Sequence, residues 1–346
     1  MASAAQSSLF PLAAPITTRE IARRVKDGGV AALTEARLRA DEARYQEIHC
    51  RSALNPVKGM PFGWTLNPYR GCTHGCHYCF ARRYHTQFEM DGGDEFASVI
   101  LVKANLPDVL RRELDRPAWK RELVALGTAT DPYQPIEGHY KLTRQALQLL
   151  AESRTPVSVV TKGPMALRDR DLFVELGRRA RCTVCFSVPT VDDEGWRLLE
   201  PGTAPPLQRL RAMRALVEAG VHAGVLMAPI VPGMTSSRAK LEATVKAAAD
   251  HGARFVGTSV LYLEGGTREH FLRFLQSVYP NLADRYGRLY RGKYASKRYT
   301  TELHALTSLL RERYGVIRRE RPDPPPNEDA SDVEDPHQNV FAFQDA

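Results

Sequence analysis

Three cysteines within one short stretch are the residues of this chain best suited to do chemistry. They lie at Cys72, Cys76 and Cys79, spaced C-x3-C-x2-C in a loop punctuated by glycines, and no fourth cysteine is near them in the sequence. Three thiolates can hold three irons of a cubane iron–sulfur cluster and leave the fourth iron open. A cluster closed by four cysteines mainly transfers electrons, whereas an open iron can bind and activate a small molecule. The spacing therefore predicts a [4Fe–4S] cluster with an open iron.

Zinc is the alternative metal for the same loop. His74 and His77 lie between the cysteines, so a Cys3His zinc site is conceivable. Structural zinc sites more often use two pairs of ligands separated by a dozen or more residues. Four ligands this close together in sequence would crowd one tetrahedron, so the pattern favours a cluster.

Apolar runs and helical segments alternate along the rest of the chain. The first strand, 64–66, leads into the cysteine loop. Later apolar runs read as buried strands, and the segments between them have helical periodicity or helix-ending residues. We expect further strands over 123–127, 157–160, 184–188, 221–228 and 254–263, and helices over 105–115, 142–151, 237–251 and from Pro206 to Gly220.

This alternation sets the fold class. About six strand–helix repeats imply a parallel sheet with right-handed crossovers. Six units are too few for an eight-unit barrel, so the sequence predicts an α/β fold built as a partial (β/α)6 TIM-like barrel. A flat doubly wound sheet is the alternative, although no glycine-rich phosphate fingerprint follows the first strand. In either case the chemistry belongs at the carboxyl ends of the strands, where the cysteine loop lies.

Composition divides the 346 residues into a core and three flanking segments. Residues 18–50 are rich in Ala, Arg and Glu, which predicts an N-terminal helical extension over 1–54. Residues 55–300 form the expected core domain. A C-terminal helix is expected over 301–321, and the acidic, proline-rich residues 322–346 predict a disordered tail.

The cysteine content and the hydropathy point to the cytoplasm. Six cysteines in a chain of this length, three of them clustered, fit a reducing compartment better than a disulfide framework. Cys182 and Cys185 are three apart on an expected strand, so their thiols should point to opposite faces of the sheet. No apolar stretch approaches the roughly 20 residues of a membrane span, and the N-terminus does not read as a signal peptide.

The residues around the cysteines resemble a known family. The C-x3-C-x2-C loop after the first strand, with the aromatic Tyr78 directly before the third cysteine, is similar to that of the radical S-adenosylmethionine (SAM) superfamily. The wider sequence resembles the spore photoproduct lyase-related branch of that superfamily. Its resemblance is carried by residues 59–62, 65–72, 130–135 and 161–162.

The resemblance implies cofactors, a reaction and partners. The cofactors would be a [4Fe–4S] cluster and SAM, and SAM would be cleaved reductively to a 5′-deoxyadenosyl radical that abstracts hydrogen from a substrate. A lyase-like activity is implied, on a substrate that the sequence does not identify. An electron donor such as flavodoxin or ferredoxin is the implied redox partner.

The resemblance also implies residues that contact SAM. Lys162 and Ser187 match the carboxylate-binding positions by their strand placement, and Thr130 and Asp131 stand at the strand end that binds the amino group. Met227, at the end of the fifth strand, could offer adenine an apolar face. Simpler interpretations stay open: Lys162 as a surface lysine, Asp131 as a turn cap before Pro132, and Met227 as core.

A second feature suggests nucleic acid as a partner. Residues 322–346 hold seven acids and no Lys or Arg, so the 48 basic residues face only 33 of the 40 acidic ones in the rest of the chain, a net charge of about +15. Residues 285–299 interleave six basic residues with four tyrosines, a composition that can bind phosphates and stack on bases. Tyr286 and Tyr290 are four apart and could instead pack as a helix face. The alternative function is a cluster-dependent nucleic-acid-binding or redox-sensing protein that does not cleave SAM.

Overall fold

Six parallel strands form the sheet that the alternating pattern predicts. The computed structural model describes residues 39–85, 93 and 95–317. Its larger sheet has the strand order β10-β9-β8-β7-β6-β3-β2, in which only β2 runs antiparallel to its neighbour. The strands of this sheet are β2 (Leu54–Pro56), β3 (Trp64–Leu66), β6 (Val124–Leu126), β7 (Val157–Thr161), β8 (Cys182–Ser187), β9 (His222–Ile230) and β10 (Val256–Val260).

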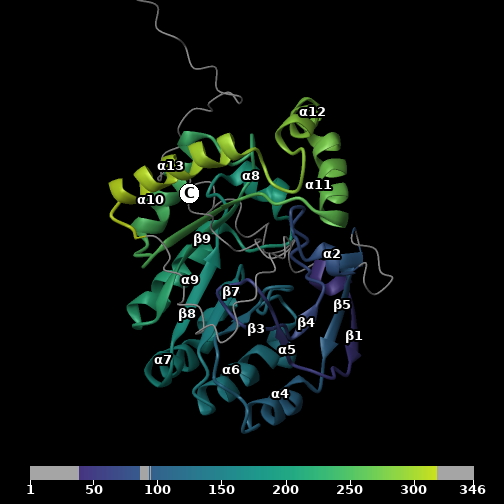
Figure 1. The fold of residues 1–346 in the computed structure, drawn as a ribbon, viewed down its shortest axis with the longest axis vertical. Coiled ribbons are helices and arrows are strands. Elements are labelled where there is room, and N and C mark those ends of the chain that lie inside the picture. Colours follow the sequence, from purple (N-terminus) through teal and green to yellow (C-terminus); the bar gives the residue numbers. More distant parts are fainter. Residues whose placement is uncertain (1–38, 86–92, 94, 318–346) are drawn as a thin grey trace, which may run out of the picture.

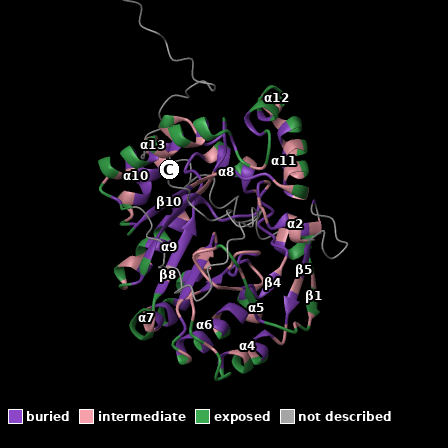
Figure 2. Ribbon diagram, viewed as in Figure 1, coloured by how far each residue is buried: buried purple, intermediate pink, exposed green. Residues whose placement is uncertain are grey.

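The strand order confirms the partial barrel and excludes the doubly wound alternative. From β3 to β10 each parallel strand is added beside the previous one, so every crossover steps in the same direction. A doubly wound sheet would reverse its order at a switch point and place helices on both faces. Figure 1 shows the helices arranged outside the curved sheet, and Figure 2 shows buried residues in the strands and exposed residues on the outer helical faces.

Helices connect the strands and cover the outside of the sheet. None of them, in the part of the chain that the structure describes, is long and apolar enough to cross a membrane. The helices are α2 (Arg82–His85), α3 (Glu95–Ser98), α4 (Leu106–Leu114), α5 (Glu137–Tyr140), α6 (Leu142–Glu152), the 3-10 helix η2 (Pro164–Asp169), α7 (Arg170–Arg179), α8 (Asp193–Leu199), α9 (Pro206–Glu218), α10 (Arg238–Asp250), α11 (Gly265–Val278), α12 (Pro280–Leu289) and α13 (Lys297–Arg313).

The predicted N-terminal helix over 18–50 is wrong at its C-terminal end. Residues 44–48 form a strand, β1 (Arg44–Ile48), which pairs in parallel with β5 (Val99–Lys103). β5 also pairs antiparallel with β4 (Tyr69–Arg70), which completes a second sheet of three strands. Pairing with β5 and the packing of Tyr45 against the small core behind it outweigh the local helix propensity of this segment. The rest of the predicted extension, 1–38, lies outside the described residues.

The C-terminal boundaries also differ from the prediction. α13 begins at Lys297 and ends at Arg313, whereas a helix over 301–321 was expected. Its buried side chains, among them Leu303 and Leu310, pack in the main core, and the helix contacts α10 and β10. The predicted disordered tail over 322–346 lies outside the described residues.

One buried cation stands out in the small sheet. The side chain of Lys103 is 5% exposed at the end of β5. Burial, and after it the charge of Arg70, lower the pKa of Lys103 to about 8, although Cys50 and Glu113 act in the opposite direction. Below pH 8 the folded protein therefore keeps Lys103 protonated at a cost in folding free energy. Above pH 8 Lys103 loses its proton in the folded state.

This cost predicts a pH-dependent stability. Below pH 8 Lys103 is protonated in both the folded and the unfolded state, and the desolvation of its buried charge destabilises the folded state. Between about pH 8 and 10 the unfolded chain alone keeps the proton, so folding stability should rise by up to about 3 kcal/mol. Lys103→Met should be more stable than the wild type at pH 7 and should lack this rise, as measured by urea unfolding at pH 7, 8, 9 and 10. If the free energy of unfolding changes with pH in the same way for Lys103→Met and the wild type, the lowered pKa of Lys103 is wrong.

Candidate active site

A cavity opens where the carboxyl ends of the parallel strands meet the cysteine loop. It contains about 1040 Å³ of space between atoms, including the part open to solvent. Its wall comes from the loop and from the ends of β6, β7, β8, β9 and β10. The residues singled out from the sequence that line it are Cys72, His74, Cys76, Tyr78, Cys79, Thr130, Asp131, Lys162 and Ser187.

Glycines allow the cysteine loop to turn in a confined space. Gly71 has a φ of +77°, and a Cβ at this position would lie 2.6 Å from the carbonyl oxygen of Val99. Gly75 also has a left-handed conformation, with a φ of +61°. The backbone N–H of Cys72 donates to the carbonyl of Phe96 at 2.9 Å, which ties the start of the loop to α3. The left-handed glycines and this hydrogen bond thus define how the chain enters the loop.

A buried arginine holds the centre of this loop. The Arg82 side chain is 2% exposed, and its Nε donates to the carbonyl of Cys76 at 3.0 Å. Its two terminal nitrogens donate to the carbonyls of Gly75 at 2.8 Å and Gly93 at 2.6 Å. The guanidinium also lies 4.9 Å from the ring centre of Phe96. Because two of these three bonds are to carbonyls of the loop, Arg82 fixes its path.

The segment after β6 holds the other side of the loop. The hydroxyl of Thr130 donates to the carbonyl of Gly71 at 2.6 Å. The fully buried side chain of Gln134 donates to the same carbonyl at 3.3 Å and accepts the N–H of Thr73 at 3.2 Å. The side chain of Thr130 therefore points to the loop.

Asp131 joins the ends of β6 and β7. Its Oδ1 accepts from the Thr161 hydroxyl at 2.6 Å and from the Tyr133 N–H at 2.9 Å, and its Oδ2 accepts from the Lys162 N–H at 2.6 Å. The Nδ1 of His74 lies 3.3 Å from Oδ2 but without hydrogen-bond geometry. Burial acts to raise the pKa of Asp131, but His74 and the hydrogen bonds outweigh it and lower this pKa to about 2. The carboxylate thus caps the turn while also lining the cavity.

Lys162 and Ser187 stand on adjoining strand ends. The Lys162 ammonium lies 3.8 Å from a carboxylate oxygen of Glu200 and 5.6 Å from the ring centre of Tyr78. Burial acts to lower the pKa of Lys162, but the nearby Cys76 and Glu200 charges outweigh it and raise that pKa. The Ser187 hydroxyl donates to the carbonyl of Ala228 at 3.2 Å. Lys162 is a half-buried residue of the cavity wall, so the surface-lysine interpretation does not hold.

Met227 is the predicted contact that does not line the cavity. Its side chain is fully buried and belongs to the main core, as the simpler interpretation held. Side chains alternate along a strand, so its neighbours Leu226 and Ala228 line the cavity instead. The apolar face at this strand end is real, but it comes from those two residues.

The thiols of Cys182 and Cys185 point to opposite faces of β8, as predicted. Cys182 belongs to the main core, whereas Cys185 packs with Leu226 and Phe255 in a separate cluster inside the barrel. Neither of them forms a disulfide bond. Cys185 is fully buried beneath the residues that line the cavity.

The three cysteines of the loop fit a cluster better than a single ion. Among residues 39–85, 93 and 95–317, no three His, Cys, Asp or Glu side chains are placed to hold one metal ion, so the geometry gives no support to a Cys3His zinc site. In a cluster each thiolate binds a different iron, which allows wider spacing. Burial raises the pKa of Cys72 well above its usual value and that of Cys76 to about 12, so metal loading must release their protons.

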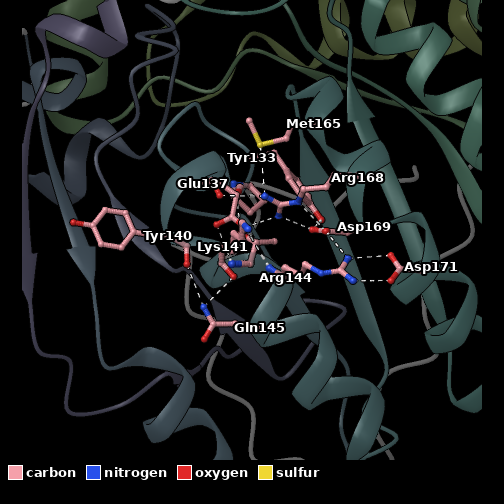
Figure 3. A network of polar contacts seen from close by, with 12 residues as sticks. Tyr133, Glu137, Tyr140, Lys141, Arg144, Gln145, Met165, Arg168, Asp169 and Asp171 are labelled. Carbon is pink, nitrogen blue, oxygen red and sulfur yellow. Dashed lines mark hydrogen bonds and ion pairs between the residues drawn. The ribbon is translucent and has the colours of Figure 1, made fainter.

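A second polar network joins residues outside the cavity lining (Figure 3). The carboxylate of Glu137 accepts from the Tyr69 hydroxyl at 2.5 Å and from Arg168 at 2.7 Å. Arg168 also binds Asp169, which pairs with Arg144 at 2.9 Å. These contacts fasten η2 to the segment after β6. None of the five residues lines the cavity.

The tyrosines of the segment 285–299 have divided roles. Tyr286 and Tyr290 are buried, their rings stack at 5.3 Å, and their hydroxyls donate to the carbonyls of Pro232 and Leu261, each at 2.8 Å. The expectation that these two pack against the core is therefore correct, although Tyr290 lies one residue beyond the end of α12. Tyr294, in contrast, is 38% exposed.

Tyr294 belongs to a cluster of aromatic and charged residues at the edge of the cavity, which we call the mouth cluster. Its ring lies 5.1 Å from that of Tyr262, a cavity-lining residue whose hydroxyl donates to Glu264. Glu264 also pairs with Arg83 and lies 3.7 Å from Lys293. The Lys293 ammonium is 5.8 Å from the Tyr294 ring centre. The cluster thus groups two cations and two aromatic rings around Glu264, and one of those rings, that of Tyr262, lines the cavity.

Comparison with known proteins gives one family match. The model of the radical SAM superfamily matches residues 66–248. An uncharacterised protein of Mycobacterium tuberculosis is 40% identical over 294 residues, which cover 84% of this chain and 86% of the relative. A radical SAM Nα-GlyT isomerase of Pseudomonas phage M6 is 26% identical over 173 residues, which cover 49% of this chain and 33% of that protein.

Among solved structures, spore photoproduct lyase has a similar fold. A mutant of that enzyme with bound AdoMet and dinucleoside spore photoproduct aligns with a TM-score of 0.61. The alignment covers 80% of this chain and 82% of the lyase, at 17% sequence identity. At this identity the likeness shows the fold.

Gly202 lies so close to the cysteine loop that we expect substitution at this position to disturb the loop. Its N–H donates to the carbonyl of His74 at 3.0 Å, and a Cβ there would lie 2.3 Å from the carbonyl oxygen of Thr73. Gly202→Ala should displace the loop, cost about 1–3 kcal/mol of stability, and lower the iron retained after anaerobic reconstitution. Gly177→Ala is the control, because a Cβ at this position in α7 meets nothing within 4 Å. Equal iron content and melting temperature in the two variants would refute the prediction.

Proposed function

The chain belongs to the radical SAM superfamily, and we propose that it is an enzyme that cleaves SAM reductively at a [4Fe–4S] cluster held by Cys72, Cys76 and Cys79. The observation that carries the proposal is that these three cysteines line one cavity together with Lys162 and Ser187. When bound, the reduced cluster and SAM supply a 5′-deoxyadenosyl radical that takes a hydrogen atom from the substrate. The electron would come from a donor protein such as a flavodoxin or a ferredoxin.

The side chains of the cavity wall suit SAM. The Lys162 ammonium would pair with the carboxylate of SAM, and the Ser187 hydroxyl would add a hydrogen bond. The backbone at Thr130 and Asp131 would face the amino group, because the side chains there already bind the protein. Tyr78 would border the same space from the cysteine loop.

Apolar residues complete the wall and limit the access of water. Leu226 and Ala228 line the cavity at the end of β9. We place the apolar surface that contacts adenine at these two residues rather than at Met227. Phe80, Phe96 and Leu261 also line it. A wall of this kind would protect a reactive intermediate from solvent.

The proposal predicts SAM cleavage that depends on the cysteine loop. Anaerobically reconstituted, dithionite-reduced protein should convert SAM to 5′-deoxyadenosine and methionine, slowly even without substrate. Cys76→Ala should reduce this to background, because one iron loses its ligand. Cys182→Ala is the control, since that thiol is buried in the main core, and it should keep the activity. A reduced, iron-loaded wild type that leaves SAM intact would favour the redox-sensing or nucleic-acid-binding alternative.

We further propose that the substrate is nucleic acid, either DNA or RNA. A protein of similar fold has been solved with a dinucleoside spore photoproduct bound. Here the mouth cluster places Lys293 and Arg83, both half-buried, beside the exposed ring of Tyr294. Cations of this kind can contact phosphates, and an exposed ring can stack on a base.

The substrate proposal predicts loss of binding at the mouth cluster. Lys293→Ala combined with Tyr294→Ala should weaken binding of a short single-stranded oligonucleotide by about tenfold, since stacking on one base contributes about 1–3 kcal/mol. Wild-type affinity should also fall as salt rises. Arg298→Ala is the control, because this 91% exposed arginine of α13 pairs with Glu302. Fluorescence anisotropy would measure the affinities, and absence of binding at low salt would exclude nucleic acid.

A further inference from the structure

The segment 199–203, between α8 and α9, lies along the cysteine loop. The carbonyl of Leu199 accepts the N–H of His77 at 3.0 Å, and the N–H of Gly202 donates to the carbonyl of His74 at 3.0 Å. These two bonds flank Glu200. The backbone hydrogen bonds on both sides of Glu200 therefore hold its side chain next to the loop.

Glu200 is a buried carboxylate that contacts three groups of the site. It is 3% exposed. Its Oε1 accepts from the Tyr78 hydroxyl and lies 3.8 Å from the Lys162 ammonium. Its Oε2 lies 2.7 Å from the guanidinium of Arg209. Burial acts to raise the pKa of Glu200, but Arg209 and then Lys162 outweigh it and lower this pKa. The carboxylate is thus charged and shared between two cations.

Arg209 connects this carboxylate to the end of β8. Its side chain is fully buried, and it donates to the carbonyl of Ser187 at 2.9 Å and to that of Ala204 at 2.8 Å. A third donor reaches the hydroxyl of Thr203. With all these bonds made, the guanidinium is a rigid support on which Glu200 rests.

The charges and distances assign different roles to the two cations. Arg209 is bonded to Glu200 at 2.7 Å, whereas Lys162 lies farther away at 3.8 Å and lines the cavity. Two cations share one carboxylate, so the group carries one surplus positive charge at the cavity wall. A buried surplus charge is costly unless an anion meets it. The charge of Cys76 also acts on Lys162, and a ligand with a single carboxylate would add a further anion inside the cavity.

We propose that Glu200, fixed by Arg209, is a positioning residue that orients the Lys162 ammonium and the Tyr78 ring for the carboxylate of SAM. The inference rests on the proposed function. Glu200 does not itself line the cavity, so it acts through the two residues it contacts. It also joins the cysteine loop, the end of β7 and the end of β8 through one side chain and its support.

The test compares Glu200→Gln with a matched buried glutamate. Glu137 is also fully buried and bonded to a tyrosine and an arginine, but it lies in the network of Figure 3, outside the cavity lining. Both Gln variants should lose stability. With iron content matched, Glu200→Gln should bind SAM at least tenfold more weakly, and Glu137→Gln should bind it like the wild type. Anaerobic calorimetry with SAM on the oxidised cluster gives the dissociation constants.

A double-mutant cycle separates positioning from a structural effect. If Glu200 acts through Lys162, Glu200→Gln should change SAM affinity little in a Lys162→Ala background. Full additivity, or wild-type affinity in Glu200→Gln, would overturn the inference. If Glu200→Gln does not fold, Glu200→Asp keeps the charge but shortens its reach, and wild-type SAM affinity in that variant would also overturn it.

Failure of the inference is distinguishable from failure of the proposed function. If the iron-loaded wild type does not bind SAM, both the proposed function and the role of Glu200 are wrong. If the wild type binds and cleaves SAM while Glu200→Gln behaves like Glu137→Gln, the inference alone is wrong.

Discussion

The cysteine loop keeps its shape because buried groups from three other segments bind its backbone. Arg82 binds two of its carbonyls, Gln134 binds both a carbonyl and an N–H, and Gly202 approaches too closely to allow a side chain. Unpaired buried backbone groups are costly, so these contacts define one stable path for the loop. The thiols are then presented to the cavity without any fourth cysteine of the described chain beside them.

Electrostatics organise the opposite wall of the cavity. The strand ends carry Asp131, bound by its neighbours, and Lys162, held near Glu200 and Arg209. In the proposed cluster site, the thiols of the loop would become anionic on binding metal. The Lys162 ammonium would therefore lie in the same cavity as thiolates that carry negative charge. This arrangement suits a ligand that carries an ammonium, a carboxylate and a sulfonium, as SAM does.

The sequence could predict the fold and the position of the cysteine loop, because both depend on local patterns. The apolar runs identify the six parallel strands, and the C-x3-C-x2-C spacing identifies the loop. Arg82, Glu200 and Arg209 could not be found in this way, since one arginine or glutamate in a helical or loop segment gives no local signal, and their roles depend on contacts between distant segments. β1 was missed because it is stabilised by pairing with β5, and Met227 was placed at the cavity because strand direction alone does not fix which face a residue occupies.

The central claim is that the protein leaves one iron of the cluster for SAM. Mössbauer spectroscopy of protein reconstituted with ⁵⁷Fe, recorded with and without SAM, tests it most directly. The account predicts that SAM changes the signal of a single iron of the cluster and leaves the other three unchanged. Four equivalent irons that do not respond to SAM would contradict it.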